Sequence, residues 1–193
     1  VQRVYCHRSI ARDVAARLAA IGSELKVGDP TQADTEVGPL IRHTEVRRVE
    51  DWVSEAVKAG AELLCGGERL SDSCYAPTVL FNPADDVRVS QMEIFGPVIC
   101  VYGYEDVDEA IDRANSLPFA FHAAVFTKNI DAALDGYRRL DASAVMVNDH
   151  TAFRVDWMPF AGLQQSGLGT GGIPYTFEDM QVEKLLVVRS PSL

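Results

Sequence analysis

The 193-residue sequence lacks the features of several protein classes. Its four cysteines are scattered without C-x-x-C spacing, which argues against both a disulfide framework and a zinc site. No apolar run approaches the length that crosses a bilayer and no secretory signal is visible, so we expect a cytoplasmic protein without a membrane partner. The absence of lysine and arginine runs, with a net charge of −10, argues against nucleic acid as a partner. The G-x-S-x-G motif of an α/β hydrolase is also missing.

Short β-branched runs alternate with stretches of helical periodicity along the chain. Hydrophobic residues make up 47% of the sequence, which is enough for one ordinary globular core. The expected strands span residues 1–7, 61–65, 75–81, 98–104, 123–127, 142–147 and 184–189. The expected apolar helix faces are Ile10, Val14, Leu18 and Ile21; Val46, Val49, Trp52, Val53, Ala56 and Val57; Val107, Ala110, Ile111, Ala114 and Leu117; and Ala132, Leu134 and Tyr137.

Helix-end signals support this assignment. Gly60 can end the second helix, while Asp106 and Asn129 can cap the third and the fourth. The alternating order predicts an α/β fold in which right-handed crossovers build a parallel sheet. In such sheets the chemistry lies at the carboxyl ends of the strands. We therefore expect functional loops after Val89 and from about Asn148 to Gly172.

Several motifs occur in a fixed order along the chain. They are VGDP at 27–30, VGPLI at 37–41, QMEIFGPV at 91–98, Val147-Asn148, PFAG at 159–162, SGLG at 166–169 and the closing stretch 183–188. Together they resemble, from end to end, the C-terminal half of the catalytic domain of the aldehyde dehydrogenase family. The resemblance implies an NAD(P)-dependent enzyme that oxidises an aldehyde to a carboxylic acid through a cysteine thioester.

The resemblance also implies how the chain is organised. Residues 1–172 would form part of a parallel-sheet, three-layer αβα catalytic lobe, and residues 173–193 an oligomerisation tail. The family's nucleophilic cysteine precedes the arginine that Arg3 resembles, so it is expected upstream of Val1, together with the general base and most of the cofactor-binding half. The chain alone is therefore expected to hold no catalytic residue and to be inactive. Cys6 is interpreted as a small buried thiol of the first strand.

Glu93 and Phe95 are the candidate cofactor-binding residues. A carboxylate can accept two hydroxyl hydrogen bonds, which suits a ribose diol. By resemblance, Glu93 holds the nicotinamide ribose of NAD or NADP, and Phe95 packs near the nicotinamide ring. The alternative is that Glu93 caps the following turn and that Phe95 belongs to the core.

Phe153, Arg154 and Phe160 are the candidate substrate-binding residues, and no metal ligand is predicted. Phe160 matches the family's aromatic wall along the aldehyde chain, and Phe153 is a second candidate for the same role. The Arg154 guanidinium can bind a carboxylate or phosphoryl group bidentately. Residues 148–159 resemble the branches that oxidise phosphonoacetaldehyde or glyceraldehyde 3-phosphate. The alternative is a surface pair between Arg154 and Asp156.

Two segments near the C-terminus carry further expectations. Residues 167–172 satisfy G-x-G-x-x-G but follow a polar loop, so we expect loop glycines with positive φ and no dinucleotide fingerprint. By resemblance, Tyr175–Arg189 provides a strand that joins a neighbouring subunit of a homo-oligomer (a dimer or tetramer), and pairing within the chain is the alternative. A second class of function, a non-catalytic folding and oligomerisation module, also stays open, although the Glu93–Phe95 motif argues against it.

Overall fold

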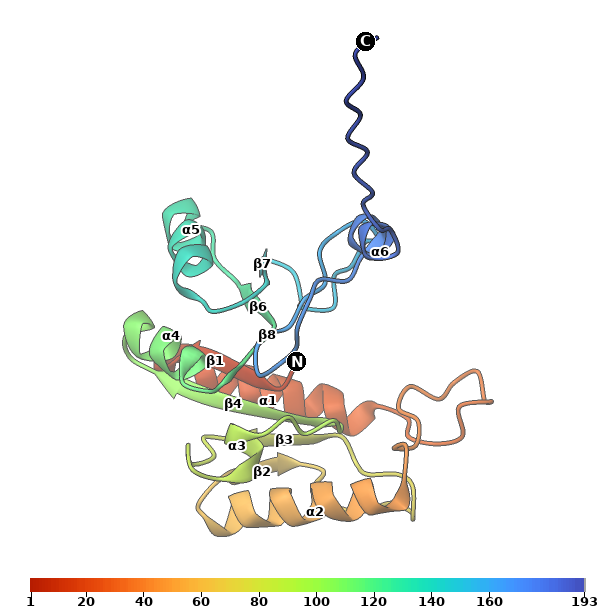
Figure 1. The fold of residues 1–193 in the computed structure, drawn as a ribbon. Coiled ribbons are helices and arrows are strands. Elements are labelled where there is room, and N and C mark those ends of the chain that lie inside the picture. The colour runs from red at the N-terminus through yellow and green to blue at the C-terminus, as the bar shows by residue number, and fades with distance from the viewer. Residues whose placement is uncertain (193) are drawn as a thin grey trace. The chain divides into compact units, whose positions relative to one another are not determined.

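The computed structural model describes residues 1–192, and the chain divides after Asp112 into two compact units (Figure 1). In the first unit four strands form one sheet in the order β1-β4-β3-β2; they are β1 (Arg3–His7), β2 (Glu62–Cys65), β3 (Thr78–Phe81) and β4 (Val98–Tyr104). β1, β4 and β3 are parallel, as predicted. The edge strand β2 departs from the prediction because it runs antiparallel to β3, with an irregular register between Leu63 and Cys65.

Helices cover both faces of this sheet, so the predicted three-layer αβα arrangement is confirmed in the first unit (Figure 1). Successive side chains of a strand point to opposite faces. Cys100 and Tyr102 of β4 therefore pack in the larger core cluster with α2 (His43–Lys58), whereas Val101 packs on the other face with α1 (Arg8–Glu24). β3 begins later than expected, at Thr78, because Pro77 has no N–H to donate to a strand ladder.

The buried face of α1 differs from the prediction. Ala11, Ala15 and Ala19 are the buried residues, while Ile10 is 52% and Ile21 53% exposed. The alanines recur at the same spacing as the larger residues, and their small side chains let the helix backbone approach the sheet closely. Val14 and Leu18 are half-buried, and Leu18 packs against the smaller core cluster, so the predicted face was right only in part.

The second helix matches the prediction more closely. Five of its six expected residues, all except Val57, are buried in α2. Gly60 has φ +103 just beyond the helix end, and the Ala61 N–H donates to the Ala56 carbonyl over 2.9 Å. This bond closes a Schellman-type turn, as expected for a glycine in that position.

Helix α4 (Val107–Asn115) spans the division, and the second unit contains two small sheets. β6 (His122–Val125) pairs in parallel with β7 (Ala144–Val147) after the intervening α5 (Ile130–Arg139), and β5 (Phe119–Ala120) pairs antiparallel with β8 (Leu163–Gln164). The predicted helix caps are confirmed: the Asp106 side chain accepts a bond from the Asp108 N–H, and Asn129 accepts from Asp131 and Ala132.

The apolar face predicted for α5 was wrong. Ala133 and Gly136 are buried, whereas Leu134 and Tyr137 are 43% and 65% exposed. A Cβ atom at position 136 would lie 2.9 Å from Cγ2 of Val125, so the strand and the helix approach too closely for a larger side chain. As in α1, the smallest residues face the sheet.

The end of the described chain also departs from the prediction. A short helix, α6 (Ile173–Asp179), occupies part of the expected tail. Residues 184–189 belong to no strand or sheet within residues 1–192, so the alternative of pairing within the chain finds no support. Their apolar side chains are largely exposed, with Leu185 at 86% and Leu186 at 82%. Among residues 1–192 no helix is long and apolar enough to span a membrane.

Candidate functional site

The segment that carries Glu93 and Phe95 lies at the amino end of β4, not at the carboxyl end of a strand as predicted. Val89 belongs to the short helix α3 (Arg88–Gln91), and the chain then enters β4 through Gly96-Pro97. β3 and β4 are parallel, so a chain that leaves the carboxyl end of β3 has to return to the other end of the sheet before β4 begins.

Phe95 projects into solvent in a strained backbone conformation. Its side chain is 76% exposed and its φ is +47, a value that is a genuine outlier for a bulky residue. The neighbouring Ile94 is only 1% exposed. The alternative in which Phe95 belongs to the core is therefore wrong. Glu93 is also exposed, and among residues 1–192 its carboxylate accepts no hydrogen bond that would cap a turn.

Two residues that sequence reasoning missed hold this segment in place. The Gln2 carboxamide accepts a bond from the Ile94 N–H and donates to the carbonyls of Met92 and Val89. From α2, the Arg48 guanidinium donates to the Ile94 carbonyl over 2.5 Å. These contacts join residues 46 to 92 positions apart, so no local sequence signal could have indicated them.

Cys6 of β1 and Cys100 of β4 are not activated nucleophiles. Burial raises the pKa of the Cys6 thiol, and it raises the pKa of Cys100 to about 12. A reactive cysteine needs a lowered pKa, because the thiolate is the nucleophile. Both thiols thus stay protonated near neutral pH. Cys6 is half-buried in β1, which is less than the full burial expected of it.

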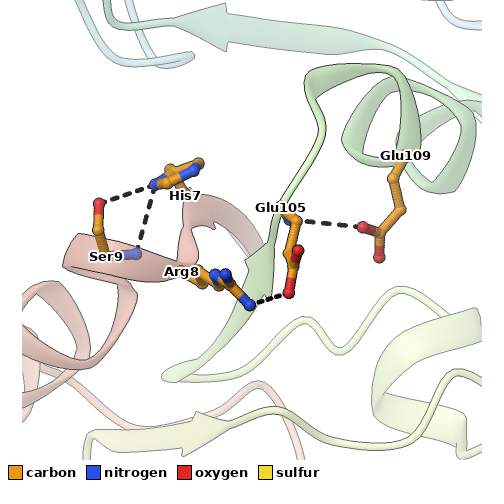
Figure 2. Close-up of polar contacts among 5 residues, drawn as sticks. All are labelled: His7, Arg8, Ser9, Glu105 and Glu109. Carbon is orange, nitrogen blue, oxygen red and sulfur yellow. Dashed lines mark hydrogen bonds and ion pairs between the residues drawn. The ribbon is translucent and has the colours of Figure 1, made fainter.

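The carboxyl ends of β1 and β4, where parallel sheets usually carry chemistry, hold polar groups that pair with each other (Figure 2). Nδ1 of His7 lies 2.7 Å from Oγ of Ser9 and accepts a bond from the Ser9 N–H, so His7 caps α1. Arg8 forms an ion pair with Glu105. All of these side chains are exposed, and this edge is best described as a helix cap with a surface ion pair.

In the second unit, the loop from Asn148 onward follows the carboxyl end of β7, as predicted. Asn148 has φ +58, and its side chain bonds to both the N–H and the carbonyl of Thr127. Phe153 lines an open cavity of about 330 Å³ together with Asp149, Met158 and the residues of β7. Arg154 and Phe160, the other two candidate substrate residues, do not line this cavity.

Arg154 and Phe160 lie together. The Arg154 guanidinium carbon is 4.1 Å from the centre of the Phe160 ring, a cation–π contact. Phe160 meets Phe121 and His122 edge to face, and those two rings stack 3.9 Å apart. The structure thus favours this contact over the alternative surface pair with Asp156. Sequence reasoning did not find Phe121 or His122, because they precede Phe160 by nearly forty positions and lie at or just before the start of β6, outside the loop that holds Phe160.

The glycine run at residues 167–172 behaves largely as expected. Gly169 has φ +76 and Gly172 has φ +117. Gly172 directly precedes the short helix α6. The preceding strand β8 pairs antiparallel with β5, however, so the glycine run does not follow the strand of a βαβ unit and forms no dinucleotide fingerprint.

Comparisons with known proteins agree on one family. The model of the aldehyde dehydrogenase family matches residues 1–186. A 3-sulfolactaldehyde dehydrogenase from Priestia megaterium is 38% identical over 97% of this chain and 39% of its own length. The structure of aldehyde dehydrogenase 21 from Physcomitrella patens with the product succinate has a TM-score of 0.92 at 35% identity, covering 98% of this chain and 39% of that one.

A glyceraldehyde-3-phosphate dehydrogenase, GapN, from Methanocaldococcus jannaschii in complex with NADP has a TM-score of 0.87 at 35% identity, covering 92% of this chain and 38% of that one. The chain therefore spans about two fifths of the length of these relatives. Because the family model covers nearly all of the sequence, and because the same order of motifs lies on the same fold, this chain belongs to the aldehyde dehydrogenase family.

Proposed function

We propose that the protein containing this chain oxidises an aldehyde to a carboxylic acid with NAD or NADP, and that the chain contributes cofactor and substrate contacts. The observation that carries the proposal is the Glu93–Phe95 segment. It presents an exposed aromatic ring two residues from an exposed carboxylate, on a backbone held in a strained conformation. Strained residues of this kind cluster at ligand sites.

These two side chains fit a nicotinamide dinucleotide. The Glu93 carboxylate offers two acceptor oxygens for a ribose diol, and the Phe95 ring offers a flat apolar surface for a nicotinamide ring. When bound, the cofactor accepts the hydride that aldehyde oxidation releases. Our proposal gives Glu93 the task of orienting the ribose and Phe95 that of limiting the positions open to the ring.

The proposed covalent chemistry needs a nucleophile from outside this chain. A cysteine thiolate would add to the aldehyde carbon, and after hydride loss water would hydrolyse the thioester to release the acid and regenerate the thiol. Cys6 and Cys100 are poor candidates, since burial raises the pKa of both thiols. We therefore expect no aldehyde-dependent NAD(P)⁺ reduction by the chain alone.

An anionic aldehyde is the proposed substrate class. Arg154 is an exposed cation seated on the Phe160 ring, and Phe160 is 40% exposed. Such a pair can bind a negatively charged group beside an apolar chain. The names of the three relatives support this class, since they refer to sulfolactaldehyde, succinate and glyceraldehyde 3-phosphate. Phosphonoacetaldehyde belongs to the same class.

The test follows NAD(P)H formation by the protein that includes this chain and its nucleophile. Glyceraldehyde 3-phosphate and phosphonoacetaldehyde are compared with a neutral aldehyde of similar length, in the parent and in Arg154→Ala. A charge-assisted contact predicts a KM at least about tenfold higher for the anionic aldehydes only. Arg138→Ala, at an exposed arginine of α5, is the control. Equal use of both substrate types, unaffected by Arg154→Ala, would return Arg154 to a surface role.

We also propose that Tyr175–Arg189 joins a neighbouring subunit in a homo-oligomer, because its apolar residues are exposed and unpaired within the described chain. The same observation favours a second candidate function, a non-catalytic folding and oligomerisation module. Oligomerisation without aldehyde oxidation, in the protein that includes the upstream sequence, would support that candidate. Cytoplasmic localisation stays a prediction.

A further inference from the structure

The backbone of Ile94 is held from both sides by side chains from distant parts of the first unit. We propose that Gln2 and Arg48 are positioning residues that fix the backbone of Ile94 and thereby set the orientation of Phe95 and Glu93 toward the cofactor. The inference rests on the proposed function, because it assigns a task to the same segment. Neither side chain is itself proposed to touch the cofactor.

Gln2 makes three hydrogen bonds to the backbone of α3 and of the segment between α3 and β4. Its Oε1 accepts from the Ile94 N–H over 2.8 Å. Its Nε2 donates to the Met92 carbonyl over 2.8 Å and to the Val89 carbonyl over 3.1 Å. Only a carboxamide both accepts and donates in this way, since a carboxylate cannot donate and a thioether does neither well.

Arg48 completes the arrangement from α2. Its Nη2 donates to the Ile94 carbonyl over 2.5 Å, and its Nε donates to Glu45 over 2.7 Å. The guanidinium also lies over the Trp52 ring, 4.4 Å from its centre. The ion pair with Glu45 and the contact with the Trp52 ring hold the Arg48 guanidinium in one orientation, so Arg48 is a rigid support for the Ile94 carbonyl.

These contacts explain how Phe95 keeps a positive φ. A bulky residue in that region persists only when its surroundings over-determine the backbone. The N–H and the carbonyl of the preceding residue are both bonded, and the Ile94 side chain is 1% exposed in the core. The peptide group between Ile94 and Phe95 is thus held in place. Its release would let the φ angle of Phe95 relax to negative values, which would turn the Phe95 ring away from its present direction.

The first experiment measures hydrogen exchange at the Ile94 amide in this chain. Gln2→Met removes the acceptor and should speed that exchange about tenfold or more, because the amide loses its partner. The matched control is Gln91→Met, at an exposed glutamine of the same segment, where we expect no change. The Val101 amide in β4 reports on the sheet and should exchange equally in all variants. An unchanged Ile94 rate in Gln2→Met would overturn the proposal.

The second experiment uses the protein that includes its cofactor-binding half. Gln2→Met is expected to raise the KM for NAD(P)⁺ about tenfold or more while leaving the KM for the aldehyde unchanged. A variant that lost only fold stability would lower the active fraction and the apparent kcat, and it would leave both the cofactor KM and the aldehyde KM unchanged. If Gln2→Met does not fold, Arg48→Lys gives the same test, because it keeps the positive charge beside Glu45 but shortens the reach to Ile94. Arg47→Lys, at the exposed neighbouring arginine, is its control.

Glu93→Gln separates the two proposals. A raised cofactor KM in Glu93→Gln with no effect in Gln2→Met or Arg48→Lys would leave the proposed function standing and overturn the positioning role. Faster Ile94 exchange in Gln2→Met, with a cofactor KM unchanged in both Glu93→Gln and Gln2→Met, would show that the contacts hold the segment but that the segment does not serve the cofactor. That result would overturn both the proposed function of Glu93 and the positioning role.

Discussion

Replacing two glycines of the first unit with alanine separates steric overlap from backbone strain. Gly66 and Gly60 both have positive φ, +68 and +103. A Cβ atom at position 66 would lie 2.2 Å from the Pro77 carbonyl oxygen and 2.6 Å from Oγ1 of Thr78, whereas at position 60 no atom lies within 4 Å. The two sites share the strain and differ in the overlap.

The expected magnitudes follow from this difference. An L-residue in the left-handed region costs roughly 1–2 kcal/mol at either site. Gly66→Ala adds about 1–3 kcal/mol, since the backbone oxygen of Pro77 cannot move without shifting the start of β3. The reduced freedom of the unfolded chain is common to both substitutions and cancels in the comparison. The free energy of unfolding should therefore fall by about 2–5 kcal/mol in Gly66→Ala and by about 1–2 kcal/mol in Gly60→Ala.

Urea unfolding measures the difference. Trp52 is 8% exposed in the first unit, and Trp157 is 70% exposed in the second. In a Trp157→Phe background, the fluorescence therefore reports on the first unit alone. Both positions have positive φ, so strain alone would make Gly60→Ala as damaging as Gly66→Ala. A midpoint that falls as much in Gly60→Ala as in Gly66→Ala would refute the argument from overlap.

Three further predictions concern the tail, an ion pair and a buried thiol. Leu186→Asp in the exposed tail should reduce the oligomer mass measured by light scattering in the protein that includes this chain, and an unchanged mass would argue against the tail as an interface. The hydrogen bond from Arg12 lowers the pKa of the Glu62 carboxyl from its ordinary 4.5, so the pair stabilises the fold above that value and the contribution is lost as pH falls through the lowered pKa. Glu62→Gln should accordingly flatten the acid limb of the urea midpoint against pH, and an identical limb would contradict this. Burial raises the pKa of Cys100 to about 12, so at pH 8 it should react with a maleimide at least about a hundredfold more slowly in the native chain than in urea, and equal rates would contradict the burial.

Local signals predicted the elements well because each depends on a few neighbouring residues. The bounds of β4 were predicted as residues 98–104, and the caps at Asp106 and Asn129 bond as expected. The fully buried residues of α1 and α5 were missed because the rule assigns large apolar residues to the core. In α1, Ala15 has the same periodicity as Val14, and the choice between them depends on how closely the helix approaches the sheet, which periodicity does not encode.

The supports of the Glu93–Phe95 segment could not be predicted from the sequence, and the roles assigned to Glu93 and Phe95 stay predictions. Glu93 and Phe95 lie in a short, contiguous motif, and the strand that follows it, β4, was predicted with the correct bounds. The bracing of Ile94 by Gln2 and Arg48 depends on tertiary contacts across 92 and 46 positions, for which one sequence holds no signal. The contact between Arg154 and Phe160 was predictable only in part. Both residues were predicted from the sequence of their loop, but the stacking of the guanidinium on the ring is seen only in the structure.

The placement of β1 at the edge of a sheet built from later strands has a consequence for biosynthesis. Arg3 of β1 pairs with Cys100 of β4, and the ion pair between Arg8 and Glu105 likewise joins residues 97 positions apart. At a translation rate of about 5–20 residues per second, β1 leaves the ribosome roughly 5–20 s before its partner strand exists. The antiparallel pair of β2 and β3 can form in the meantime from local contacts. During that interval Val4 and Tyr5, which later pack against the core clusters, lack the β4 ladder that holds them, so chaperones can bind this segment while β4 is being made.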